Sequence, residues 1–216
     1  MKYIIFDMDG VLIDSMPKHI TAWKKALLKY NIKVNDLELA LNEGANQKLF
    51  LDKILKKYNI KKSFEERKEI INEKKKIFLK YKIKLFPVKK ILNYLKKNNI
   101  KLAVGTGGSK ESVEKNLNEI KHYFEFIVNG DEIKKGKPNK ETYSKIVKQF
   151  KANKKEVIVI ENAPLGITSA KNAGLKCYAI ETSLPKKYLK DADKIFNNHK
   201  ELFEFLKKLL FNAINP

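Results

Sequence analysis

The sequence predicts an α/β fold, a doubly wound parallel sheet that carries an inserted all-α domain. The chain opens on a short apolar run with β-branched members, Tyr3–Phe6, as expected of a strand buried on both faces. From Pro87 onward, short apolar runs alternate with helical segments of about ten residues, which is typical of a parallel sheet. Between these two parts the periodicity is helical only. We therefore expect an α/β domain at residues 1–15 and 84–216, and a helical domain at residues 16–83.

The individual elements follow from the spacing of the apolar residues. In the inserted segment these residues recur at helical spacing, for example at Ile20, Trp23 and Leu27. The helices expected there cover residues 17–30, 37–41, 49–58 and 64–81. The strands expected after the first one cover residues 101–105, 126–128, 157–160, 177–180 and an edge strand at 194–196. The remaining helices are expected at residues 88–97, 109–120, 140–150, 164–173 and 200–210.

The composition is that of a soluble globular protein, with 43% hydrophobic and 33% charged residues. No apolar run approaches the roughly 20 residues that a membrane-spanning helix needs. The first strand begins at once, which leaves no room for a signal peptide. The single cysteine, Cys177, excludes an internal disulfide and fits a reducing compartment. We expect a cytoplasmic monomer with no membrane partner.

The formal net charge of +21 raises the question of nucleic-acid binding. The lysines, however, are spread over every expected helix, and Arg67 is the only arginine in the chain. Proteins that read base edges or grip phosphates with two hydrogen bonds rely on arginine. The excess charge is therefore interpreted as a solvated surface that attracts anionic substrates, and no nucleic-acid partner is expected.

Two aspartates, Asp7 and Asp9, stand directly after the first strand and are followed by Gly10. The carboxyl ends of parallel strands are where open α/β sheets bind ligands. In an extended strand the two side chains would point to opposite faces, so both serve one site only if the chain turns, which Gly10 permits. The alternative is an ordinary polar turn.

Polar residues also follow two later strands. Thr106, Gly107 and Ser109 lie between a strand and a helix, where main-chain amides and hydroxyl groups can bind an anion; a plain glycine loop is the alternative. Glu161 and Asn162 end another apolar strand, although Asn162 alone could simply cap the next helix.

These segments together resemble the haloacid dehalogenase superfamily. FDMDGVLIDS is similar to the first motif of its phosphotransferase branch, and Thr106, the Lys137-Pro138 pair and Glu161-Asn162 resemble the next three motifs in order. The resemblance covers residues 3–179 and is closest to the phosphatases related to β-phosphoglucomutase. It implies a helical cap at the position of the inserted segment.

The resemblance also implies roles for the first motif and for the lysine. Asp7 would be the nucleophile, and Asp9 would be the general acid and base that also lends its main-chain carbonyl to Mg²⁺. Lys137 would bridge Asp7 and the phosphate. Pro138 biases Lys137 toward an extended conformation, which pins it locally.

The other motifs would contact the phosphate, the rest of the substrate and the metal. Thr106 and Gly107 would bind the phosphate, and Ser109 and Lys110 the rest of the substrate. Oxygen ligands from Asp7, Asp9, Glu161 and Asn162 would suit Mg²⁺. The family most often has Glu-Asp at the fourth motif, so Asn162 removes one negative charge from the expected site.

The remaining expected substrate contacts lie at the edge of the cap. They are Gly10, His19, Gly44, Asn46 and Gln47, the last three from the loop at residues 42–48. His19 could sense substrate docking or be merely a polar residue at the hinge. In the mutases an arginine occupies the position of Gln47, and a neutral amide cannot hold a second phosphate as a guanidinium does.

We therefore expect a Mg²⁺-dependent phosphatase for a small phosphorylated metabolite such as a sugar phosphate. The reaction would pass through an aspartyl-phosphate intermediate. A sugar phosphate mutase of the β-phosphoglucomutase type is the alternative. A non-catalytic binding protein on the same fold is disfavoured because both aspartates are present.

Overall fold

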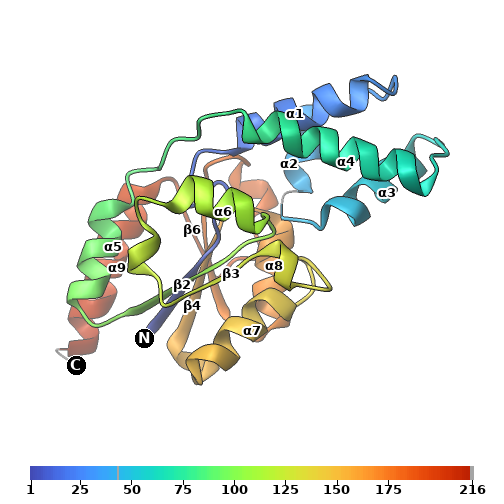
Figure 1. Ribbon diagram of the computed structural model, residues 1–216. Coiled ribbons are helices and arrows are strands. Elements are labelled where there is room, and N and C mark those ends of the chain that lie inside the picture. Colours follow the sequence, from blue (N-terminus) through green and yellow to red (C-terminus); the bar gives the residue numbers. More distant parts are fainter. Residues whose placement is uncertain (43, 215–216) are drawn as a thin grey trace.

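Residues 1–42 and 44–214 are described by a computed structural model of the chain, and their strands form one parallel sheet (Figure 1). The strands are β1 Tyr3–Phe6, β2 Lys101–Gly105, β3 Phe126–Val128, β4 Val157–Glu161, β5 Lys176–Ile180 and β6 Lys194–Phe196. They lie in the order β3-β2-β1-β4-β5-β6, and every neighbouring pair is parallel. The predicted doubly wound sheet is confirmed, including the edge strand β6.

The helices agree with the sequence periodicity to within a few residues. Those of the inserted segment are α1 Met16–Leu28, α2 Asp36–Leu41, α3 Gln47–Lys57 and α4 Phe64–Leu79. Those of the α/β part are α5 Lys89–Lys97, α6 Lys110–Leu117, α7 Glu141–Phe150, α8 Pro164–Asn172 and α9 His199–Ile214. Short 3₁₀ turns follow at η1 Lys121–Tyr123, η2 Gly130–Glu132, η3 Lys154–Glu156 and η4 Lys186–Tyr188. The predicted helix at 109–120 ends early because Ile120 donates to the Leu117 carbonyl, a tighter turn than the α-helical one.

Side chains from the two faces of the sheet form two separate cores, because successive residues of a strand point to opposite faces. On one face, Ile4 and Phe6 of β1 pack with helices α5, α6 and α9. On the other face, Ile5 packs with helices α7 and α8. Figure 1 shows α5 and α9 on one side of the sheet and α7 and α8 on the other. Both faces of the strands are therefore buried, which explains their continuous apolar sequence.

Helices α1 to α4, called the cap below, have a third core of their own that includes Trp23 and Ile70. Figure 1 shows them beside the sheet rather than against either of its faces. Their ends are set locally; for example, Ser63 and Glu66 form a reciprocal capping box at the start of α4. A division of the chain into domains at residues 16 and 84 stays a prediction, and the separate core favours it.

The two chain segments that connect the cap to the sheet run side by side. Asp14 donates its main-chain N–H to the Lys84 carbonyl over 2.9 Å, and Phe86 donates to the Leu12 carbonyl over 3.0 Å. Within residues 1–42 and 44–214, no helix is long and apolar enough to cross a membrane.

Candidate active site

The candidate site lies at the carboxyl ends of three neighbouring strands. Asp7 follows β1, Thr106 follows β2, and Glu161 is the last residue of β4. The strand order reverses between β1 and β4, and such a switch point opens a crevice at this edge of a doubly wound sheet. The register therefore brings together residues that are more than 150 positions apart in the sequence.

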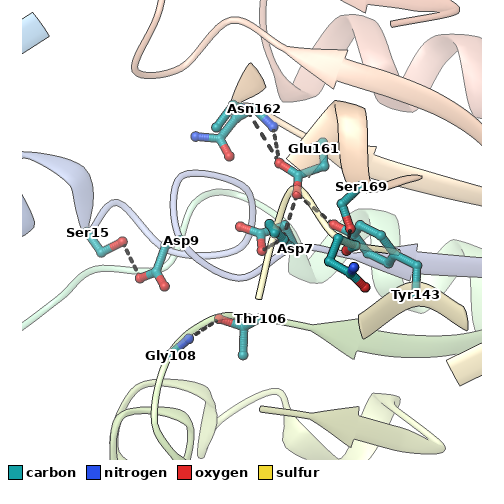
Figure 2. A network of polar contacts seen from close by, with 12 residues as sticks. Asp7, Asp9, Ser15, Thr106, Gly108, Tyr143, Glu161, Asn162 and Ser169 are labelled. Atoms are coloured by element: carbon teal, nitrogen blue, oxygen red, sulfur yellow. Dashed lines mark hydrogen bonds and ion pairs between the residues drawn. The ribbon is translucent and has the colours of Figure 1, made fainter. Parts of the chain in front are cut away.

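A buried cluster of charges connects three of the predicted residues. The Lys137 Nζ donates to Asp7 Oδ1 over 2.5 Å and to Glu161 Oε1 over 2.6 Å. The Tyr143 hydroxyl donates to the same Glu161 oxygen over 2.6 Å (Figure 2). The Tyr143 ring lies 5.0 Å from the Lys137 Nζ. All four side chains are buried, with exposed fractions from 0 to 4%. Lys137 is therefore fixed beside Asp7, as the sequence resemblance implied.

The charges in this cluster do not balance, because two carboxylates share one ammonium group. Burial raises the pKa of Asp7 above its ordinary value, and the negative charges of Glu161 and Asp9 add to this effect against the opposing charge of Lys137. The same two carboxylates outweigh burial at Lys137 and raise its pKa, so the lysine stays protonated. A further positive charge next to Asp7 would favour its ionised, nucleophilic form.

Asp9 has partners on the side of the cap. The Ser15 hydroxyl donates to Asp9 Oδ1 over 2.6 Å, and His19 Nε2 lies 3.0 Å from the same oxygen. Burial raises the pKa of Asp9, but these contacts with His19 and Ser15, together with the charge of Lys74, hold it below its ordinary value. Figure 2 shows Asp9 and Ser15 apart from the Asp7 cluster. The two aspartates thus have separate partners and opposite pKa shifts.

Lys74, on helix α4, was not identified from the sequence. It is 3% exposed, and its Nζ lies 3.0 Å from His19 Nδ1. The His19 ring stacks on Phe78 at 3.8 Å, and burial and the charge of Lys74 lower the pKa of His19 despite the opposing effect of Asp9. A protonated Lys74 can only donate, so His19 accepts at Nδ1 and donates from Nε2 to Asp9. The sequence does contain one indication that Lys74 is buried: it lies four residues from both Ile70 and Phe78, on the apolar face of α4.

A cavity of about 70 Å³ lies between the cap and the carboxyl ends of the strands. Its sheet side is formed by Asp7, Asp9 and Thr106. Its cap side is mainly apolar, with polar groups from His19 and Lys74 among others. The apolar residues that line it are Met16, Ile20, Trp23, Leu39, Ala45 and Phe50. This lining suits a small molecule with one anionic group placed at the sheet.

Only some of the residues predicted after β2 lie at the cavity. The Thr106 hydroxyl accepts from the Gly108 amide over 2.9 Å, and Thr106 and Gly107 line the cavity. Ser109 caps helix α6 by accepting from the Ser112 amide. Lys110 lies along a separate groove, where its amide donates to Asp131 Oδ2. The structure therefore brings Thr106 and Gly107 to the cavity but does not bring Lys110 there.

The loop before α3 reaches the same cavity from the cap. Gly44 and Gln47 line it, whereas the Asn46 side chain accepts from the amides of Lys48 and Leu49 and caps α3. Residue 43 of the predicted loop 42–48 lies outside the described residues. At the other end of the site, Gly10 has a φ of 79°, and its carbonyl accepts from the Thr182 hydroxyl over 2.7 Å. Gly10 thus provides the turn predicted after the aspartates, rather than a wall of the cavity.

The donors available for a metal ion are oxygen atoms of mixed type. Lys137 and Tyr143 occupy Glu161 Oε1, and the amides of Asn162 and Ala163 donate to Oε2, so Glu161 could bind a metal only by giving up such a bond. Accordingly, no group of three His, Cys, Asp or Glu side chains among the described residues is arranged to hold a metal. The other candidate donors are Asp7 Oδ2, the Asp9 carbonyl and the Asn162 amide oxygen, and an all-oxygen set of this kind fits Mg²⁺.

Known phosphatases and a phosphoglucomutase resemble this chain in sequence or in structure. The phosphorylated carbohydrates phosphatase of Thermotoga maritima is 30% identical over 189 residues, which are 85% of this chain and 87% of that protein. The fructose-1-phosphate phosphatase of Escherichia coli is 26% identical and covers 80% of this chain and 92% of its own. The solved structure of β-phosphoglucomutase from Clostridium difficile is 26% identical, covers 100% of both chains and has a TM-score of 0.84. The model of the haloacid dehalogenase-like hydrolases matches residues 4–180. The chain belongs to the haloacid dehalogenase-like hydrolase family.

Proposed function

We propose that the protein is a Mg²⁺-dependent phosphatase that hydrolyses small phosphorylated metabolites, sugar phosphates above all, through a phosphorylated Asp7. The observation that carries the proposal is the separation of the two aspartates. Asp7 is held by Lys137 at the end of β1, whereas Asp9 is held by Ser15 and His19 on the cap side. Asp7 is thus available as a nucleophile. Asp9 can give a proton to the departing substrate oxygen and take one from the attacking water.

The first half of the reaction transfers the phosphoryl group to the protein. Asp7 attacks the phosphorus atom, and the bond to the substrate oxygen breaks as Asp9 gives that oxygen a proton. Lys137, the Thr106 hydroxyl and the amide of Gly107 hold the phosphoryl oxygens, which carry most of the charge in such a transfer. Asp9 needs a proton for this step, and the arrival of an anionic phosphate beside it favours the protonated form.

In the second half, water attacks the phosphorus atom of the aspartyl-phosphate. Asp9, now a carboxylate, accepts the proton of the water, and Asp7 leaves as a carboxylate. Asp7, the Asp9 carbonyl and Asn162 would hold Mg²⁺. When bound, the ion supplies positive charge that offsets the negative charge of the nucleophile and the phosphate.

The likeness to the two sugar phosphate phosphatases supports the substrate class. The likeness to β-phosphoglucomutase favours a second candidate, transfer of the phosphoryl group to another hydroxyl of a sugar phosphate. We favour hydrolysis because the position expected to hold a second phosphate is the neutral Gln47. The monomeric state and the cytoplasmic location are part of the proposal and rest on the sequence.

The test is phosphate release from a panel of phosphorylated metabolites, with Mg²⁺ and with EDTA. Activity should require Mg²⁺ and should be lost in Asp9→Ala. The matched control is Asp14→Ala, because Asp14 lies on the same segment but its side chain is exposed. Conversion of β-glucose 1-phosphate to the 6-phosphate with little phosphate release would identify a mutase instead. Equal release in Asp9→Ala and the unaltered protein would refute the mechanism.

A further inference from the structure

The cap loop touches the α/β part through backbone rather than through long side chains. Ala45 pairs with Lys137 in an isolated parallel β-bridge. A Cβ atom built on Gly107 would lie 3.0 Å from the Gly44 carbonyl oxygen. A Cβ atom built on Gly136 would lie 3.1 Å from the Asn46 Cβ and 3.2 Å from its amide nitrogen. Contacts this short are tighter than nine in ten real Cβ contacts, so a larger residue fits there only if its neighbour moves by a few tenths of an ångström.

The same loop lies against the lysine of the buried charge cluster. Gly44 has a φ of 76°, and a Cβ atom there would lie 3.1 Å from the Cδ of Lys137. Lys137 is 3% exposed, and the loop contributes to covering it. The cap loop therefore contacts both the backbone and the side chain of Lys137, which holds Asp7 and Glu161.

We propose that residues 44–46 form a latch that positions Lys137 when the cap is seated, and that Gly107 and Gly136 are glycines because the latch needs this backbone approach. The lysine is then held between Asp7 and Glu161 only while the loop lies on the sheet side. Access to the cavity and the position of Lys137 are thereby controlled by the same loop. Gly44, Ala45 and Gly136 are positioning residues in this scheme. The expected change in kcat/KM rests on the proposed function, whereas the expected change in the position of the loop does not.

Gly136→Ala is the direct test, because Gly136 has no assigned role in binding or catalysis. The added methyl group would meet the Cβ and the amide nitrogen of Asn46, and we expect the loop to lift in response. Because the lifted loop no longer positions Lys137, we expect kcat/KM to fall about tenfold, which corresponds to about 1.4 kcal/mol.

Two measurements do not depend on activity. Trp23 is the only tryptophan and lines the cavity, so quenching of its fluorescence by acrylamide should increase when the latch lifts. Amide hydrogen exchange in peptides that cover residues 44–46 and Lys137 should become faster, while exchange in the sheet stays unchanged.

Gly174→Ala is the matched control. Gly174 has a φ of 74° and lies after helix α8, so alanine there strains the backbone without touching the latch. It should lower thermal stability but leave Trp23 quenching and loop exchange as in the unaltered protein. If Gly136→Ala does not fold, Gly44→Ala tests the latch through its other contact, that of Gly44 with the Lys137 side chain.

Unchanged quenching and exchange in Gly136→Ala would overturn the latch, and so would equal changes in Gly174→Ala. Absence of activity toward every substrate would overturn the proposed function but leave these two measurements to decide the latch.

Discussion

Lys74 should make the stability of the protein depend on pH in a way that a single substitution removes. Its ammonium group is buried, and no carboxylate oxygen of the described residues lies within 4.0 Å of it. Its surroundings are His19 Nδ1 at 3.0 Å and the rings of Trp23 and Phe78 at 5.4 and 5.2 Å. Burial lowers the pKa of Lys74 from 10.5 to about 8, although the charge of Asp9 opposes the shift.

The direction of this pH dependence follows from the number of protons that the folded and unfolded chains bind. Between pH 8 and 10.5 the unfolded chain binds a proton at Lys74 that the folded chain has lost, so the free energy of unfolding rises with pH. The cost of the buried charge is fully present below about pH 8 and disappears above about pH 10.5. Lowering the pKa from 10.5 to about 8 corresponds to a cost of about 3 kcal/mol for the buried charge.

The substitution Lys74→Met keeps the length of the side chain and removes the charge. Urea unfolding of both proteins at pH 7 and pH 10 gives the difference in their free energies of unfolding, in which all other lysines cancel. We expect this difference to move by about 2 to 3 kcal/mol in favour of the unaltered protein as the pH rises. Lys75→Met is the control, because Lys75 is partly exposed and lies 3.5 Å from Glu111. Parallel pH curves for Lys74→Met and the unaltered protein would refute the reasoning.

Three further predictions concern the cluster around Asp7. Asp7→Asn should abolish turnover and leave folding intact, as measured by phosphate release and circular dichroism; residual full activity would refute the assignment of the nucleophile. Tyr143→Phe removes a buried hydrogen bond to the charged Glu161, so the free energy of unfolding should fall by about 2 kcal/mol in urea titrations. A loss below about 0.5 kcal/mol would show that Lys137 alone satisfies Glu161 Oε1. Asn162→Asp adds a negative charge to the proposed metal site, so calorimetric titration should show about tenfold tighter Mg²⁺ binding. Unchanged affinity would exclude residue 162 as a ligand.

Most of the fold could be predicted because its signals are local. Strands buried on both faces need continuous apolar runs, and β1, β2 and β4 have them. Their chemistry-bearing residues were also visible, since a polar residue directly after such a run lies at the carboxyl end of the sheet. For this reason Asp7, Thr106 and Glu161 could be assigned to one site before their contacts were known.

The partners of those residues could not be predicted, because each contact joins distant parts of the chain. Glu161 was expected to face a metal, but its carboxylate lies against Lys137, Tyr143 and two amides, and the backbone at Gly166 approaches it so closely that a Cβ would overlap it. Lys110 is predicted to contact the rest of the substrate, and its side chain lies along a separate groove.

Lys74 illustrates the difference most clearly. In the sequence it is one of three consecutive lysines in a charged helix, and only its spacing of four residues from Ile70 and Phe78 separates it from Lys75 and Lys76. Burial depends on which face of α4 meets α1, and these two helices pack against each other only in the folded cap. The sequence by itself determined the elements, the sheet and the motifs, because these depend on neighbours along the chain. The tertiary structure decided which charges are buried and which groups face them, because desolvation and Coulomb interactions depend on distance in space.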